Sequence, residues 1–305
     1  MKNSPYFKQA DLMLRVLPSL HGEERFAIKG GTALNFFLLD MPRLSVDIDL
    51  TFLPLLPRDE TLKSIGEALN ELASRIKRAM PDVSITPKKA KGGARTTKLF
   101  VSRSDAQIKI EPNEIIRGCV FPCEEHTLVK NAEDLFELSV SVSSLSRPDL
   151  YGGKLCATLD RQHPRDFFDI KLLMDNGGIT DQIRKAFVVY LASHNRPMNE
   201  LLNPTWQDIK QLYENEFDGI SAIDVSYDDL IAVRNVLLKE LVGSLTDRER
   251  KFLLSIKMGE PEWDMMEVEG LDKLPAIQWK LLNIRKMTKA KYEKDSAKLR
   301  QILEI

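Results

Sequence analysis

Two different hydrophobic periods divide the chain. Between residues 58 and 80, apolar side chains recur at helical spacing, which predicts one long amphipathic helix. Between residues 46 and 52, apolar and polar side chains alternate, which is typical of a strand with one buried face. Shorter runs predict strands at residues 26–28, 83–86, 97–102 and 106–111, and a short edge strand within 138–145. Helices are expected at residues 11–20 and from Thr32, which would be the N-cap of the second.

The chain after residue 180 shows no strand pattern. Helical spacing there predicts helices at residues 181–193, 206–216, 227–245, 247–258 and 274–303. A length of 305 residues suits one large or two moderate domains. We therefore expect an α/β (or α+β) domain with a mixed sheet at residues 1–146, followed by an α-helical domain at residues 147–305.

Composition and charge are ordinary for a soluble globular protein. The net charge is −1, so any surface that binds nucleic acid must be local. Cys119, Cys123 and Cys156 make no even disulfide framework and indicate a reducing compartment. Cys119 and Cys123 lie near His126, but no fourth zinc ligand is evident close by. No apolar run approaches membrane-spanning length, so we expect a cytoplasmic protein without membrane partners.

The clearest candidate chemistry lies between residues 28 and 50. Asp47 and Asp49 are two apart on a predicted strand, so both carboxylates should leave the same face. Mg²⁺ prefers oxygen ligands and is usually held by one or two carboxylates plus substrate phosphates. Gly30 and Gly31 precede a predicted helix, where a backbone without Cβ atoms can approach a ligand and N–H groups can bind an anion. These residues together predict a site for a metal ion and a nucleotide.

A Gly-Gly-Thr turn followed by Asp-x-Asp on the next strand resembles the nucleotidyltransferase superfold typified by DNA polymerase β. Residues 29–34 (KGGTAL) and 43–50 (RLSVDIDL) are similar to one branch, the AbiEii/MenT toxins of type IV abortive-infection systems. The resemblance implies that Gly30, Gly31 and Thr32, with Arg43 and Ser45, bind the nucleotide. It also implies a two-metal Mg²⁺ site at Asp47 and Asp49.

In this superfold a third carboxylate comes from a neighbouring strand, and Glu111 is the residue that we expect there. It would complete the metal site with Asp47 and Asp49 and help to deprotonate the attacking hydroxyl group. The alternative is a strand-end glutamate paired with Lys109 or Lys130.

A second block, residues 151–170, resembles the other two motifs of the same toxins. By position, Lys154 matches the family lysine, Arg165 and Asp166 match a basic–acidic pair, and Asp169 matches the second aspartate. Asp166 and Asp169 are three apart on a predicted helix that begins near Pro164, so they should be neighbours on its surface. Lys154 would neutralise triphosphate charge during transfer. The alternative for this block is a structural salt-bridge network.

The resemblance implies a toxin that transfers a nucleoside monophosphate from an NTP to the 3′ end of tRNA, thereby blocking aminoacylation. The active site would lie in the cleft between the domains, with Lys154, Asp166 and Asp169 supplied by the helical one. A separately encoded antitoxin and a role in phage defence are implied too. A small-molecule or protein acceptor, and a non-catalytic NTP-binding regulatory module, remain alternatives.

Two basic segments are candidates for RNA contacts. The predicted hairpin after residue 86 and the last predicted helix concentrate lysine and arginine, whereas the whole chain is almost neutral. Either segment can instead be a solvated surface. The candidates are Lys88, Lys89, Lys91, Arg95, Lys286, Lys289 and Lys291.

Overall fold

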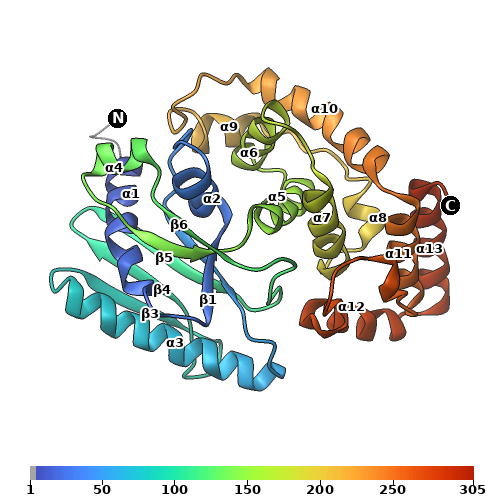
Figure 1. Ribbon diagram of the computed structural model, residues 1–305, viewed down its shortest axis with the longest axis horizontal. Helices are drawn as coiled ribbons and strands as arrows, with labels where there is room; N and C mark the ends of the chain where they lie inside the picture. The colour runs from blue at the N-terminus through green and yellow to red at the C-terminus, as the bar shows by residue number, and fades with distance from the viewer. Residues whose placement is uncertain (1–4) are drawn as a thin grey trace. The chain divides into compact units, whose positions relative to one another are not determined.

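The computed structural model describes residues 5–305 (Figure 1). The chain forms two compact units. The first extends to Ser146 and includes Ile220–Ile223, and the second consists of Arg147–Gly219 and Asp224–Ile305. Residues 220–223 belong to the first unit because the amide of Leu44 donates to the Ile220 carbonyl at 3.1 Å. Nothing in the local sequence indicates this return of the chain.

The first unit is built on a mixed seven-stranded sheet with the order β3-β4-β5-β2-β1-β7-β6. The pairs β2/β5 and β1/β7 are parallel and the other neighbours are antiparallel. This agrees with the mixed sheet expected from the sequence. The strands are β1 (Phe26–Lys29), β2 (Asp47–Phe52), β3 (Ser84–Lys89), β4 (Thr96–Arg103), β5 (Ala106–Asn113), β6 (Glu124–Thr127) and β7 (Ser141–Ser144).

The edge-strand prediction is wrong. Strand β7 lies inside the sheet, between β1 and β6, and β6 forms the edge. The sequence of β6, Glu-Glu-His-Thr, lacks an apolar alternation, because its side chains are mostly exposed. A strand of this kind is recognised by its backbone pairing with β7 and not by its residue pattern.

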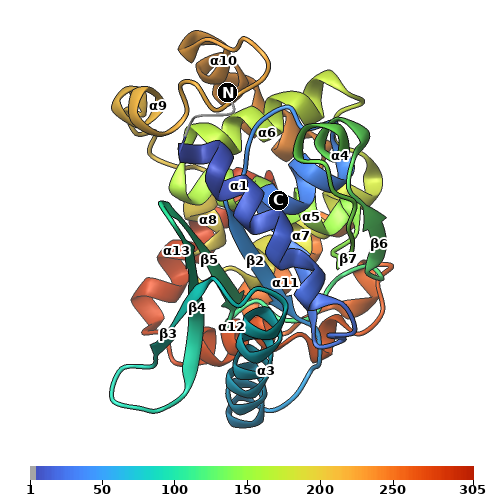
Figure 2. The ribbon, with the colours of Figure 1, turned by 90° about the vertical axis from the view of Figure 1, so that its left-hand side faces the viewer.

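The helices of the first unit cover one face of the sheet. They are α1 (Pro5–Val16), the 3₁₀ turn η1 (Leu17–Leu20), α2 (Gly30–Ala33), the π-helical turn η2 (Leu34–Leu38), α3 (Arg58–Ala79) and α4 (Lys130–Phe136). Figures 1 and 2 show α1 and α3 on the same side of the sheet. Ile48 and Leu50 of β2 and Ile108 and Ile110 of β5 are fully buried. The residues that alternate with them therefore leave the opposite face.

Two predicted helix boundaries in this unit are wrong. Helix α1 begins at Pro5 and ends at Val16 instead of spanning residues 11–20, because Pro18 lacks the N–H that would continue the α-helical pattern, and a 3₁₀ turn follows. Thr32 is not an N-cap, since Lys29 occupies that position and helix α2 begins at Gly30. The long helix predicted at residues 58–80 is confirmed as α3.

The second unit is helical, as expected. Its helices are α5 (Arg147–Arg161), α6 (Pro164–Asp175), α7 (Asp181–Ser193), α8 (Met198–Leu201), α9 (Lys210–Glu216), α10 (Tyr227–Ser244), α11 (Asp247–Met258), α12 (Pro275–Arg285) and α13 (Lys289–Leu303), with 3₁₀ turns η3 (Trp263–Met265) and η4 (Leu271–Lys273). Several begin at side-chain caps that the sequence encodes locally. Ser226 with Asp229, and Thr246 with Glu249, form capping boxes at α10 and α11.

The single helix predicted at residues 274–303 is wrong. Helix α12 ends at Arg285 and α13 begins after Thr288, whose backbone is extended (φ −67°, ψ 146°). The intervening lysine and methionine residues are compatible with a helix, so the break is decided by how each half packs. Leu281 and Ile284 are buried from α12, and Leu299 and Leu303 from α13. In residues 5–305, no helix combines the length and apolar character that crossing a membrane requires.

Candidate active site

The glycine turn after β1 packs against the aspartate strand. Strands β1 and β2 are antiparallel, with Lys29 opposite Asp49. Gly30 has φ +73°, and a Cβ atom there would lie 2.9 Å from Oδ2 of Asp49. A side chain at position 30 would therefore be strained and would also press on the carboxylate. Gly30 thus keeps the space beside Asp49 open.

Gly31 is constrained by a different pair of side chains. A Cβ atom on Gly31 would lie 2.7 Å from Nη2 of Arg43 and 3.1 Å from Oγ of Ser45. Arg43 is almost fully buried, and its Nη1 donates to the Leu44 carbonyl at 3.0 Å. The structure thus brings together Gly31, Arg43 and Ser45, all predicted to bind nucleotide. The sequence predicted that a ligand approaches the backbone of the two glycines. In the structure the groups that lie close to them are side chains of the protein itself, Asp49 at Gly30 and Arg43 and Ser45 at Gly31.

Thr32 fastens this turn to the start of β2. The residue is buried, and its Oγ1 lies 3.0 Å from Oγ of Ser45 and 2.5 Å from the carbonyl oxygen of Asp47. Thr32 therefore uses its hydroxyl group for tertiary contacts instead of capping a helix. These contacts fix the separation between the glycine turn and the two aspartates.

The three predicted carboxylates lie on two neighbouring strands, β2 and β5. In the parallel pair of β2 and β5, Asp49 is opposite Glu111 and Asp47 is opposite Lys109. Asp47 and Glu111 are partly exposed on the face that the core residues leave free. The predicted placement of these side chains on one face agrees with this register.

Two lysines hold the Glu111 carboxylate. Lys109 Nζ lies 3.0 Å from Oε2 of Glu111 and 4.0 Å from Oδ2 of Asp47, and Lys98 of β4 contacts Oε1 of Glu111. Burial raises the pKa of Glu111, but the hydrogen bonds from Lys98 and Lys109 outweigh it and leave this pKa below its ordinary value. Burial also opposes the charge of Lys109, yet Glu111, Asp47 and Asp49 raise its pKa. The ammonium group of Lys109 is thus the cation that interacts with all three carboxylates, Asp47, Asp49 and Glu111.

These contacts define how the residues fit a divalent ion. Asp47 and Asp49 present oxygen donors from one strand face, the chemistry that Mg²⁺ requires. Glu111 is engaged by Lys98 and Lys109, so it would have to exchange partners to become a ligand. Across residues 5–305, no three His, Cys, Asp or Glu side chains are arranged as a metal cluster. That finding includes the region of Cys119, Cys123 and His126, where the His126 ring contacts Glu124 at 3.1 Å.

A second charged cluster lies within the helical unit, where Lys154, Asp166 and Asp169 are buried and Arg161 is exposed. Lys154 of α5 lies 3.0 Å from Oδ1 of Asp166 and 2.9 Å from Oδ2 of Asp169, both on α6. Arg161, at the end of α5, donates to both oxygens of Asp166 at 2.6 and 2.8 Å. Burial raises the pKa of Asp166, but Lys154 and Arg161 outweigh it and hold this pKa far below the ordinary value. The predicted association of Lys154 with the two aspartates agrees with these distances.

Arg165 does not join this cluster. Its Nη2 lies 3.0 Å from Oε2 of Glu216 on α9, an oxygen that His163 also contacts at 3.0 Å. Consecutive residues of a helix point in different directions, so Arg165 and Asp166 cannot share a partner easily. The arginine that pairs with Asp166, beside Lys154, is Arg161, which our sequence reasoning missed. Its position at the C-terminal end of α5, facing the next helix start, was the available signal.

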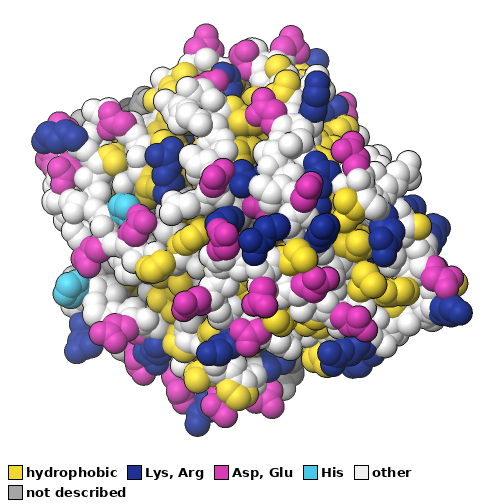
Figure 3. All heavy atoms as spheres, turned by 45° about the vertical axis from the view of Figure 1, so that its right-hand side comes forward, with side chains coloured by type: hydrophobic (Ala, Val, Ile, Leu, Met, Phe, Trp, Pro, Cys, Tyr) yellow, Lys and Arg dark blue, Asp and Glu magenta, His cyan; other side chains and the backbone are white. Residues whose placement is uncertain are grey.

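The candidate RNA-binding lysines are mostly exposed, with individual differences. Arg95 pairs with Glu114 and packs against Gly66 of α3, and Lys89 donates to Thr96 at 2.9 Å. On the face drawn in Figure 3, basic side chains are interspersed with acidic ones. Such mixing agrees with a net charge of −1. The exposed candidates are Lys88, Lys89, Lys91, Lys286, Lys289 and Lys291, whereas Arg95 is half-buried.

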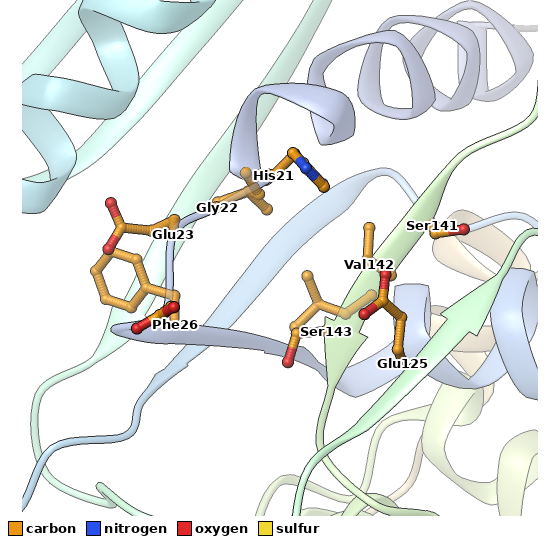
Figure 4. Close-up of a pocket in the computed structure, with 11 residues that line it drawn as sticks. His21, Gly22, Glu23, Phe26, Glu125, Ser141, Val142 and Ser143 are labelled. Carbon is orange, nitrogen blue, oxygen red and sulfur yellow. The ribbon is translucent and has the colours of Figure 1, made fainter.

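A cavity of about 330 Å³ lies in the first unit, away from the residues predicted from the sequence (Figure 4). Phe26 of β1, Val142 of β7 and Glu125 of β6 line it, together with the loop that carries Glu23. Glu23 is buried and bound by Arg25 and Arg75. None of the predicted site residues lines this cavity.

Comparisons with known proteins identify the family. The family model "Nucleotidyl transferase AbiEii toxin, Type IV TA system" matches residues 11–283. Among solved structures, the chain is similar to MenT4, a nucleotidyltransferase toxin from Mycobacterium tuberculosis H37Rv. The TM-score is 0.59 and the identity 14%, and the match covers 97% of this chain and 95% of that chain. At this identity the similarity shows the fold alone. The curated proteins include no match.

The family model spans nearly the whole chain and contains both the glycine turn with Asp47 and Asp49 and the cluster around Lys154. The fold expected from the sequence, a nucleotidyltransferase sheet followed by helices, is confirmed by the structure and by its likeness to MenT4. The chain therefore belongs to the AbiEii family of nucleotidyl transferase toxins of type IV toxin–antitoxin systems.

Proposed function

We propose that this protein transfers a nucleoside monophosphate from an NTP to the 3′-terminal hydroxyl group of tRNA, releasing pyrophosphate and blocking aminoacylation. The family supplies the reaction type. The observation that carries the assignment of residues is the register of β1, β2 and β5, which sets Gly30 and Glu111 on either side of Asp49. An antitoxin encoded separately is the expected partner.

In this proposal Asp47 and Asp49 hold divalent metal ions, with Mg²⁺ as the expected one. Bound there, the metal supplies the positive charge that phosphoryl-type transfers require. The turn of Gly30 and Gly31, with Arg43 and Ser45 packed against Gly31, is proposed to orient the nucleotide phosphates. Ser45 and Thr32 keep this turn at a fixed distance from the aspartates.

Glu111 is proposed to accept the proton of the attacking hydroxyl group. Its lowered pKa keeps it ionised at neutral pH, so it can accept a proton. The same contacts reduce its basicity, because Lys98 and Lys109 stabilise the carboxylate. Release from Lys98 would return the pKa of Glu111 toward its ordinary value and make it a stronger base.

Lys154 and Asp169 are proposed to position the helices instead of contacting the triphosphate. A lysine that neutralises phosphate charge needs an accessible ammonium group. The ammonium group of Lys154 is shared by two buried carboxylates, and its side chain is 5% exposed. Two cations and two anions balance within the cluster of Lys154, Arg161, Asp166 and Asp169. Its charges therefore stabilise the junction of α5 and α6.

The experiment is to incubate the protein with each of the four labelled NTPs and Mg²⁺, offering total tRNA, protein and small-molecule acceptors in separate reactions. The proposal expects label on tRNA alone, and none on tRNA whose 3′ end has been oxidised with periodate. The Asp47→Asn and Asp49→Asn proteins serve as controls. Label on protein, on a small molecule or on oxidised tRNA would refute the tRNA assignment. Absence of transfer to any acceptor would favour a regulatory NTP-binding module.

A further inference from the structure

A large groove opens in the helical unit, where the function proposed above assigns no role. Its volume is about 930 Å³, near the upper end of the range of roughly 300–1,000 Å³ that ligand pockets occupy. It is bordered by α8, by the segment that follows it, and by α10 and α13, all drawn on the right of Figure 1. The side chains that matter are Trp206, Arg234, Asn235, Lys239, Lys298 and Gln301.

The planar guanidinium group of Arg234 is held in a fixed orientation at this groove. Its Cζ lies 5.1 Å from the centroid of the Trp206 ring, and its Nη1 donates to the Gln207 carbonyl at 2.9 Å. The Trp206 ring is supported in turn by Phe167, with ring centroids 6.3 Å apart. Among residues 5–305, Nε of Arg234 has no hydrogen-bond partner. A guanidinium plane fixed in this way is a surface on which an unpaired base stacks.

The groove carries a local excess of positive charge. In the described part of the chain, no carboxylate lies within ion-pair distance of Arg234, Lys239 or Lys298. Glu200 is the acidic side chain on its wall, and it lies 3.6 Å from Arg196. Three cations without carboxylate partners attract an anionic ligand, most strongly at low salt.

We propose that this groove binds single-stranded RNA, with one unpaired base on the Arg234 guanidinium group and adjacent phosphates at Lys239 and Lys298. The amide side chains of Asn235 and Gln301 supply the donors and acceptors that base edges require. An acidic peptide would use the cations but would leave the stacking surface and the amides without a function. The site needs neither NTP nor divalent metal, so it stands apart from the transfer chemistry.

This placement differs from the RNA contacts expected from the sequence. The helix α13 lends Lys298, Gln301 and Ile302 to the groove, whereas Lys286, Lys289 and Lys291 do not line it. Lysine content alone cannot separate these positions, because all lie in one basic segment. The groove is selected by what its lysines are combined with: an aromatic-supported arginine and amide side chains.

The test is fluorescence anisotropy with a fluorescein-labelled RNA of about ten unpaired nucleotides, using the full chain without NTP or Mg²⁺. The variant Lys239→Glu/Lys298→Glu should bind the RNA roughly tenfold or more weakly at low salt. The slope of log K against the logarithm of the salt concentration should become shallower by about 1.4, because two phosphate contacts contribute ~0.7 each. The control variant Lys251→Glu/Lys273→Glu changes the same charge at exposed positions outside the groove. The RNA affinity of this control variant should fall by less than about threefold.

A second variant tests the stacking surface separately. Arg234→Lys keeps the charge but removes the planar group, so it should weaken binding by roughly fivefold or more while leaving the salt dependence unchanged. Circular dichroism melting verifies that each variant is folded. Equal losses of RNA affinity in the groove and control variants would overturn the proposal. Displacement of the labelled RNA by AMP at the concentrations at which unlabelled RNA displaces it would also overturn it. Tighter binding of poly-glutamate than of RNA would overturn it too. Unchanged RNA binding by the groove variants would overturn it as well. A loss of transfer by the Asp49→Asn protein with unchanged RNA binding would concern the site at Asp47 and Asp49 alone.

Discussion

Replacing Lys154 by methionine should destabilise the helical unit strongly. The substitution leaves Asp166 and Asp169, both fully buried, without the ammonium group that lies 3.0 and 2.9 Å from them. Removing one partner from a buried ion pair costs about 3–5 kcal/mol, because the remaining charge stays desolvated. Arg161 still pairs with Asp166 after the substitution, so Asp166 keeps one cation.

Urea unfolding followed by tryptophan fluorescence reports the stability of the helical unit, which carries the substitution. The protein's three tryptophans, Trp206, Trp263 and Trp279, all belong to the helical unit. With a slope of about 2 kcal/mol per molar urea, a loss of 3–5 kcal/mol lowers the midpoint by roughly 2 M.

The matched control is Lys171→Met on helix α6. Lys171 forms an exposed ion pair with Asp175, 2.7 Å away and four residues later, and such pairs contribute about 0.3–0.5 kcal/mol. Adding Asp169→Asn to Lys154→Met should restore roughly half of the lost stability, since it removes one of the two buried negative charges that lose the ammonium group. A midpoint for Lys154→Met equal to that of the control would refute the account of the buried cluster.

Three further predictions concern the remaining site residues. Asp49→Asn should reduce nucleotide transfer by ~100-fold or more, equivalent to about 3 kcal/mol of lost transition-state stabilisation, with an unchanged melting temperature; near-normal transfer would contradict the metal assignment. Gly30→Ala and Gly92→Ala should each cost about 1–2 kcal/mol of stability, because both glycines have φ +73°. Only Gly30→Ala should also impair transfer, because a Cβ atom at Gly92 meets open space; equal activities would count against the role of Gly30. The low folded-state pKa of Asp166 gives stability that is full above pH about 4 and is lost on acidification. Asp166→Asn should therefore destabilise most at pH 7 and progressively less below pH 4, and urea midpoints that fall in parallel from pH 7 to 3 would contradict this.

The sequence by itself determined the features that depend on neighbouring residues. Alternation placed Asp47 and Asp49 on one strand face, because side chains two apart on a strand point the same way. Helical spacing fixed α3, and side-chain caps fixed the starts of α7 and α11. The paired motifs were specific enough to indicate the family, which the match over residues 11–283 confirms.

Tertiary structure decided which side chains meet across the chain. Lys98 reaches Glu111 only because β4 pairs with β5, and Arg161 rather than Arg165 binds Asp166 because α5 turns back onto α6. The groove beside Arg234 likewise requires α10 and α13 to lie together. These contacts join residues that are distant in sequence or point in different directions on a helix, so no local period contains them. The partners and the electrostatics of each site therefore arise from the fold, although the candidate residues themselves can be found in the sequence.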